Sequence, residues 1–438
     1  MKSIFPALFL LASFVCPAAA VEKLNVIVIL ADDFGYECVG ANGGTSYPTP
    51  NLDRLAATGA RFEHCYVQPL CTPTRVQLMT GQYNVRNYVQ FGLLEKSQTT
   101  FAQLFRNAGY ATCIVGKWQL GQSFDLPKHF GFDEYCLWQL TRRPERYRNP
   151  GLEINGKAID YTQGEYGPDI VNDYACEFIA RAKAKPFLLY YPMMLTHDPF
   201  VATPDSADYG GNPSKKEEKK GGKGALPQRR HFGDMVTYMD KLIGKLVDKL
   251  EAEGVRDRTL ILFVGDNGTG KGVPSQMGER TVVGGKGSPD ESGMRVPLIV
   301  NGPGVVTGRV VSDLVDSTDF LPTICAASGI VPPSDLTLDG VSFWPQCQGK
   351  AGTPRDWIYC WYARGGGAKA DAEFARDHRL KLMRDGKLFD VGAGDVNPPS
   401  LDPTRLTKED RQAVDKLQAA LDRYRDARPA AISERNGK

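Results

Sequence analysis

The sequence predicts an α/β fold with a large mixed, mostly parallel sheet flanked by helices, followed by a small C-terminal domain with a short antiparallel sheet. Short apolar runs rich in Val, Ile, Leu and aromatic residues are typical of buried strands. Such runs occur at Leu24–Ala31, Ala111–Val115, Phe187–Leu195, Thr259–Val264 and Val296–Val300. Helical patterns lie between them, and this alternation favours parallel strands joined by helices.

Three helices are expected from their capping and stop residues. They cover residues 50–58, 101–108 and 235–253. A threonine precedes the first two, and a glycine follows each of the three. The third has apolar residues at helical spacing from Met235 to Leu250, which predicts that one face packs on the sheet.

The chain divides into three parts by composition. Residues 1–20 contain Lys2, an apolar run and a stretch of small residues, which is the layout of a cleavable signal peptide. A lipid anchor at Cys16 is the alternative, but the bulky residues before it argue against that reading. We therefore expect an exported protein, periplasmic or secreted, whose mature chain begins near Val21.

The large domain is expected over residues 21–345 and the small C-terminal domain over 346–438. A charged stretch within a polar loop at about 201–230 predicts a mobile surface loop, with a grip on an anionic polymer as the alternative. Beyond residue 345, short runs at Trp357–Tyr362 and Leu380–Met383 indicate antiparallel strands. A polar final helix is expected at about 408–425.

The overall composition narrows the function classes. The chain has 438 residues, 42% hydrophobic and 24% charged, with a formal net charge of +2. This charge is too small to indicate nucleic acid or a membrane surface as a partner. Ten cysteines permit disulfides in an exported chain, although their pairing stays open. The lack of a CxxC pair and only five histidines argue against structural zinc.

Polar residues follow several predicted strands. Asp32 and Asp33 come after the first, and Asp266 and Asn267 come after a later one. Taken singly, such residues often cap a helix or form a turn. Because the carboxyl ends of parallel strands meet at one edge of the sheet, they are expected to converge. Their carboxylate and amide oxygens are hard ligands suited to calcium or magnesium.

Basic residues are expected around this cation site. Arg75, Lys117, His197 and Lys286 could donate to a tetrahedral oxyanion and neutralise charge that develops on its oxygens during transfer. Pro73 is placed to begin a helix, whose N-terminal amides would also face the anion. Each of these residues alone would be read as a solvated charge or a structural histidine, so their joint occurrence carries the prediction.

At this point the sequence resembles the type I, formylglycine-dependent sulfatase family of the alkaline phosphatase superfamily. The most specific element is CxPxR at residues 71–75 with LxTG at residues 78–81. In that family, this element directs oxidation of the cysteine to formylglycine (3-oxoalanine). The similarity also covers the segments Asn25–Asp33, Thr49–Leu55, Gly109–Thr112, Gly116–Trp118, Asp266–Gly268, Gly285–Gly287, Glu291 and Arg295–Pro297.

The resemblance implies an alkaline-phosphatase-like fold and a role for each candidate residue. One Ca2+ would be bound by the following side chains: Asp32, Asp33, Asp266, Asn267 and the modified Cys71. Arg75 would hold the formylglycine, and Lys117, His197 and Lys286 would contact the sulfate and its leaving oxygen. One hydroxyl of the hydrated aldehyde would attack sulfur, and the other would later expel sulfate. His197 or Lys286 is the candidate proton donor to the departing alcohol.

One position departs from the family pattern. Gly-Lys-Trp-His-Leu-Gly is usual, whereas residues 116–121 have Gln119 in place of the histidine. That histidine is taken to help remove the diol proton when sulfate leaves. Gln119 can hydrogen-bond to substrate but cannot act as a base near neutral pH. Turnover is therefore slower, or another group or a water substitutes.

The leading hypothesis is hydrolysis of an O-sulfate ester on a carbohydrate by a sulfuric ester hydrolase (arylsulfatase-like). Its expected partners are a sulfated glycan substrate and, during maturation, a formylglycine-generating enzyme. One alternative is a phosphate or phosphonate ester hydrolase of the same superfamily. The other, motivated by Gln119, is a sulfated-glycan binding protein with impaired catalysis.

Overall fold

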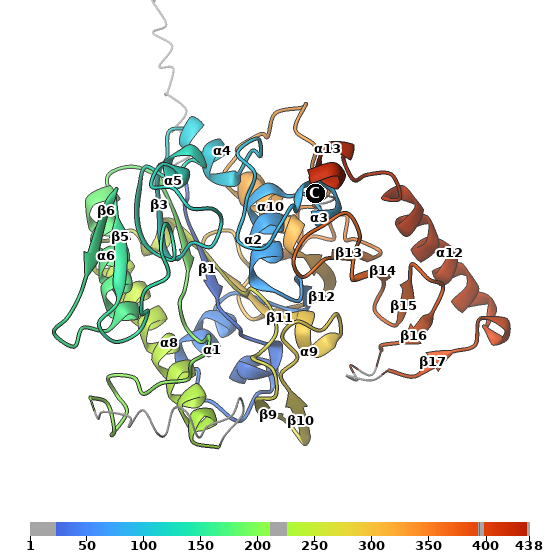
Figure 1. Ribbon diagram of the computed structural model, residues 1–438, viewed down its shortest axis with the longest axis horizontal. Coiled ribbons are helices and arrows are strands. Elements are labelled where there is room, and N and C mark those ends of the chain that lie inside the picture. Colours follow the sequence, from blue (N-terminus) through green and yellow to red (C-terminus); the bar gives the residue numbers. More distant parts are fainter. Residues whose placement is uncertain (1–22, 211–225, 393, 395–397, 436–438) are drawn as a thin grey trace, which may run out of the picture.

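The computed structural model describes residues 23–210, 226–392, 394 and 398–435, and it contains one large sheet and two smaller ones (Figure 1). The large sheet has ten strands in the order β12-β2-β11-β8-β1-β7-β3-β4-β5-β6. Its strands are β1 (Asn25–Ala31), β2 (Ala60–Tyr66), β3 (Ala111–Lys117), β4 (Glu134–Trp138), β5 (Gly151–Ile154), β6 (Lys157–Asp160), β7 (Phe187–Pro192), β8 (Thr259–Gly265), β11 (Arg295–Asn301) and β12 (Arg309–Asp316).

The centre of this sheet is parallel. β8, β1, β7, β3 and β4 run side by side in one direction, whereas β11 is antiparallel to both of its neighbours. The predicted mixed, mostly parallel sheet is therefore confirmed. The run at Phe187–Leu195 was expected as one strand, but β7 ends at Pro192, and residues 195–196 form a turn just before His197.

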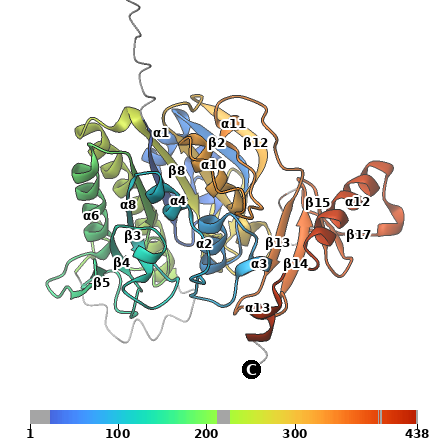
Figure 2. The ribbon, with the colours of Figure 1, turned by 90° about the horizontal axis from the view of Figure 1, so that it is seen from above.

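Helices cover both faces of the sheet (Figure 2). Alternate side chains of β1 point to opposite faces, because successive residues of a strand do so. Val26, Val28 and Leu30 join one core cluster with residues of α2 (Cys71–Thr80) and α10 (Phe320–Ala327). Ile27 and Ile29 join the other with residues of α6 (Gly167–Ala182) and α8 (Leu226–Ala252). The helices are α1 (Pro50–Ala57), α2 (Cys71–Thr80), α3 (Asn84–Asn87), α4 (Phe101–Asn107), α5 (Leu126–His129), α6 (Gly167–Ala182), α8 (Leu226–Ala252), α9 (Glu291–Met294), α10 (Phe320–Ala327) and α11 (Trp344–Cys347).

The three expected helices are present as α1, α4 and α8. Thr100 caps α4 in a capping box with Gln103, as its sequence predicts. Thr49 does not cap α1 with its side chain; instead Asp240 of α8 accepts from the amide nitrogens of Asn51 (3.0 Å) and Leu52 (2.8 Å). A sequence-local rule cannot find this cap, because its acceptor lies in another helix.

Two of the sequence predictions concern segments that lie wholly or partly outside the described residues. The signal peptide at 1–20 lies outside them, as does the 211–225 part of the polar loop expected at 201–230. The end of that loop was placed wrongly, because residues 226–230 form the first turn of α8. Within the described residues, we find no helix with the length and apolar character that crossing a membrane requires.

The C-terminal region contains the predicted small antiparallel sheet, which has five strands and lies beside the main body (Figure 2). These are β13 (Ile358–Tyr362), β14 (Ala372–Arg376), β15 (Leu380–Met383), β16 (Leu388–Asp390) and β17 (Ser400–Leu401). Helix α12 (Lys408–Arg423) contacts β14 and β15, and α13 (Ala430–Arg435) follows. A further hairpin pairs β9 (Pro274–Met277) with β10 (Arg280–Val283). The domain boundary at 345/346 stays a prediction.

The described residues also contain five short 3-10 helices, and their cysteines form no covalent links. The 3-10 helices are η1 (Tyr36–Cys38), η2 (Gly40–Asn42), η3 (Arg256–Arg258), η4 (Ser317–Asp319) and η5 (Pro403–Arg405). All nine cysteines in the described part of the chain are buried free thiols. The disulfides that export would permit are therefore not formed among these residues.

Candidate active site

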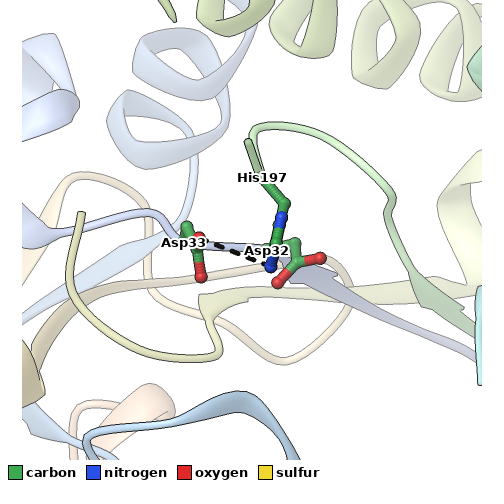
Figure 3. A group of neighbouring side chains, drawn as sticks. All are labelled: Asp32, Asp33 and His197. Atoms are coloured by element: carbon green, nitrogen blue, oxygen red, sulfur yellow. Dashed lines mark ion pairs between the residues drawn. The ribbon is translucent and has the colours of Figure 1, made fainter. Parts of the chain in front are cut away.

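The predicted site residues converge at the carboxyl ends of neighbouring parallel strands. Asp32 and Asp33 follow β1, Asp266 follows β8, Lys117 ends β3, and His197 lies on the turn after β7. Because β8, β1, β7 and β3 are adjacent and parallel, their ends open at one edge. Figure 3 shows Asp32, Asp33 and His197 grouped there.

The acids form a buried cluster. The side chains of Asp32 and Asp266 are fully buried and that of Asp33 is 1% exposed. Ligand atoms of Asp32, Asp266 and Cys71 lie within 4.8 Å of one another, and so do those of Asp32, Asp33 and His197. The backbone nitrogen of Asp33 donates to Asp266 Oδ1 (3.0 Å), which ties the two strand ends together.

Each carboxylate has a cation of its own. Lys117 Nζ lies 3.0 and 2.8 Å from the two oxygens of Asp32. Lys286 Nζ is 2.6 Å from Asp33 Oδ2, and Arg75 Nη2 is 2.9 Å from Asp266 Oδ2. Buried carboxylates require such pairing, because loss of hydration makes an isolated buried charge costly.

The electrostatics of the two innermost acids differ. Burial opposes ionisation of Asp32, yet the charges of Lys117, His197, Arg75 and Lys286 hold its pKa well below the usual range. Burial and then repulsion from Asp32 raise the pKa of Asp266 to about 6, against the opposing effect of Arg75. Ionisation of Asp266, the third carboxyl group of the cluster, is therefore less favourable than that of an ordinary aspartate.

These residues fit a hard divalent cation. Asn267 Nδ2 donates to Asp33 Oδ1 (2.9 Å), while Asn267 Oδ1 is buried and has no hydrogen-bond partner. An unsatisfied buried oxygen is unfavourable unless another group binds it. A cation next to Asp32, Asp33 and Asp266 would supply that partner, and an all-oxygen set of this kind suits Ca2+ or Mg2+.

Cys71 begins helix α2 at the same place. Its side chain is buried, and Sγ donates to Gln119 Oε1 at 2.9 Å. Burial raises the pKa of the thiol, so Cys71 is not a preformed thiolate nucleophile. Arg75 lies one turn later on the same helix, and its Nη1 donates to the carbonyl of Lys117 (2.8 Å). The spacing of CxPxR thus directs both side chains toward the acid cluster.

His197 is held by its backbone neighbours. Its Nδ1 lies 2.6 Å from the carbonyl oxygen of Asp198, and the hydroxyl of Tyr147 donates to the carbonyls of His197 and Met194. When Nδ1 donates to that carbonyl, Nε2 remains to face the site, 3.9 Å from Asp33 Oδ2. All ten candidate residues therefore lie in one connected group.

Sequence analysis missed Arg146. Its side chain is 7% exposed, its guanidinium lies 4.0 Å over the ring of Trp138, and Nη1 lies 3.9 Å from Asp32 Oδ2. Nη1 is buried without a hydrogen-bond partner. Arg146 is one of four arginines between residues 142 and 148, and no motif separates it from the others. Only the fold distinguishes it.

Comparisons with known proteins agree with this geometry. A family model described as Sulfatase matches residues 24–330. The chain is 31% identical to arylsulfatase A of Bos taurus over 79% of this chain and 72% of the relative. It is 33% identical to N-acetylgalactosamine-6-sulfatase of Homo sapiens over 75% of this chain and 66% of the relative.

Solved structures give the same result. Ps i-CgsB superposes with a TM-score of 0.77 at 28% sequence identity, covering 93% of this chain and 94% of that one. The family match spans the described strands that carry Asp32, Lys117, His197 and Asp266. The chain therefore belongs to the sulfatase family and is a sulfuric ester hydrolase.

Proposed function

We propose that this protein hydrolyses an O-sulfate ester on a carbohydrate, with formylglycine derived from Cys71 as nucleophile and one Ca2+ bound beside it. The observation that carries the proposal is that Cys71 and Arg75, at the start of α2, face the buried acids and two lysines. The carbohydrate substrate is supported by two relatives. One is named N-acetylgalactosamine-6-sulfatase, and Ps i-CgsB has been solved in complex with k-i-k-neocarrahexaose.

The proposed metal ligands are the oxygens of the acid cluster, Asn267 and residue 71. A bound Ca2+ supplies positive charge that polarises the sulfate ester and stabilises an oxygen nucleophile. The carboxylates of Asp32 and Asp33 would then be shared with the cation. Lys117 Nζ and Lys286 Nζ, which lie against Asp32 and Asp33, would donate to the sulfate oxygens.

Formylglycine explains why a buried residue can serve as nucleophile. Its hydrated form offers one hydroxyl to attack sulfur and a second whose deprotonation expels sulfate, so water need not attack the stable ester. Because Cys71 is only 2% exposed, the maturation enzyme would have to reach it before α2 is buried. Arg75, anchored on Asp266, holds the first turn of α2 in place.

The leaving alcohol needs a proton. His197 Nε2 and Lys286 Nζ are the candidate donors, since both lie beside Asp33 at the edge of the cluster. Gln119, whose Oε1 accepts from Cys71, would hydrogen-bond to the diol without taking its proton. Export to the periplasm or medium remains part of the proposal.

The modification and the substrate class can be tested together. Peptide mass spectrometry of active enzyme is expected to show formylglycine at position 71, and Cys71→Ala should abolish turnover of 4-nitrophenyl sulfate while the protein stays folded. Cys176→Ala, which removes another buried thiol, is the control. Unmodified cysteine in the active enzyme, or faster turnover of 4-nitrophenyl phosphate, would refute this mechanism and favour the phosphate alternative.

Metal removal should affect stability as well as activity. Treatment with EGTA is expected to lower Tm and activity, and added Ca2+ to restore both, because a ligand at 100 times its Kd stabilises by about 2.7 kcal/mol. Asn267→Ala should reduce this Ca2+-dependent rise in Tm, whereas Asn107→Ala, at an exposed position, should not. A Tm that does not respond to Ca2+ in the unchanged protein would contradict the metal site.

Gln119→His tests the departure from the family pattern. A histidine here could accept the diol proton, so kcat is expected to rise by about tenfold or more. The gain should increase as pH rises through about 6.5, since only neutral imidazole is a base. Gln412→His, at an exposed position on α12, is the matched control. An unchanged kcat across this pH range would show that sulfate release does not need a base at position 119.

Arg146 is proposed to contact the sulfate. Arg146→Ala should lower kcat/KM by about 10- to 100-fold, the effect of losing a charged hydrogen bond of about 1.5–3 kcal/mol. Arg146→Lys should recover only part, because lysine lacks the planar group that stacks on Trp138. Arg148→Ala, exposed and two residues away, is the control. Equal kcat/KM for Arg146→Ala and the unchanged enzyme would show that Arg146 does not contact the sulfate.

A further inference from the structure

A pocket opens next to the acid cluster. It has a volume of about 590 Å³, and its lining includes Phe91, Gln119, Gln122, Gln139, Arg142 and Arg143. Gln119 belongs to both sites, because its Oε1 accepts from Cys71 Sγ. This volume is within the range of pockets that bind small organic ligands, about 300–1,000 Å³. A substrate held here would therefore extend from the reacting ester.

The pocket adjoins the segment that carries Cys71. The backbone nitrogen of Gly92 donates to Thr72 Oγ1 (3.2 Å), which fixes the loop carrying Phe91 to the residue after Cys71. On the other side, Gln119 and Gln139 follow the adjacent parallel strands β3 and β4. Both walls are thus positioned by the elements that position the catalytic cluster.

Two glutamines of the pocket have an unusual backbone. Gln119 has φ 56° and Gln139 has φ 60°, in the left-handed region that non-glycine residues rarely adopt. Such a conformation costs roughly 1–2 kcal/mol per residue, and it tends to persist at functional sites. Gln139 Oε1 is also buried without a hydrogen-bond partner. A sugar hydroxyl would supply the missing donor.

The remaining side chains specify the chemistry of the ligand. Phe91 is 41% exposed, and its ring offers a flat apolar surface on which the apolar face of a sugar can pack. Arg142 is neutralised by Asp160, with Nη2 2.7 Å from Oδ1. Arg143 is exposed and forms no hydrogen bond or ion pair with any residue that the structure describes. Its charge is available to an anion.

We infer that this pocket binds the sugar ring next to the one that carries the scissile sulfate, and that Arg143 pairs with an anionic substituent on it. The inference rests on the proposed function, because it takes the ester at Cys71 to belong to a saccharide. It names the substrate class as a polyanionic oligosaccharide, whose second charge is a sulfate ester or a carboxylate. Aromatic stacking, amide hydrogen bonds and one free guanidinium together match that class.

The kinetic test uses three substrates with the full-length enzyme: 4-nitrophenyl sulfate, a galactan hexasaccharide sulfated on every ring, and the same hexasaccharide with only its terminal sulfate. Arg143→Ala should raise KM for the fully sulfated hexasaccharide about tenfold, with kcat within twofold, and leave the other two substrates unchanged. Phe91→Ala should raise KM for both hexasaccharides. Arg405→Ala, which removes an exposed arginine of the C-terminal region, should change none.

Equal losses on all three substrates, or none, would overturn the inference. A binding arm separates it from the proposed function: calorimetric titration of Cys71→Ala with the fully sulfated hexasaccharide, with and without Arg143→Ala. Binding that weakens about tenfold on Arg143→Ala supports the pocket even if the enzyme hydrolyses none of these substrates, and undiminished binding refutes it. Repeating the titration with an oligogalacturonate of equal length shows whether sulfate or carboxylate is the preferred anion.

Discussion

The site depends on one constraint, which is that negative charge buried at the ends of β1 and β8 has to be balanced. Asp32, Asp33 and Asp266 are removed from water, and each is paired with Lys117, Lys286 or Arg75. Without its basic partner, a buried carboxylate would keep the full free-energy cost of its lost hydration. The same requirement therefore fixes the end of β3, the start of α2 and the loop that carries Lys286. A bound cation and an anionic substrate would add charges of opposite sign, so the balance of charge at the site would be kept.

Helix α2 transmits the constraint to Cys71, the proposed nucleophile. Every residue from Cys71 to Thr80 is buried, so the helix cannot slide or rotate without opening the core. Arg75 spans the first turn, with one nitrogen on Asp266 and another on the carbonyl of Lys117. The position of residue 71 is thus set by two strand ends and by close contacts on all sides. A loop nucleophile would lack both restraints.

The sequence predicted the parts of the site that follow a repeated pattern. An apolar run followed by acids, as at Asp32 and Asp266, indicates a strand end, and parallel strands bring such ends together. Gln139 was missed because β4, which it follows directly, was not among the predicted strands. Arg146 was missed because its position depends on how the segment after β4 folds back. Likewise, β2 carries charged residues between its buried ones, and its pairing with β11 and β12 joins distant segments. Such long-range placement has no local signature.

Gln119 and Arg146 differ in how they set the charge of this site. A histidine at position 119 would change its charge near neutral pH, whereas glutamine stays neutral and an arginine stays positive. Arg146 lies near Asp32, held over Trp138, and its free nitrogen faces the cluster. The chain therefore places a permanent cation near Asp32 and a neutral amide beside Cys71, the proposed nucleophile. In the proposed mechanism, this arrangement favours binding of the anion over proton removal from the diol.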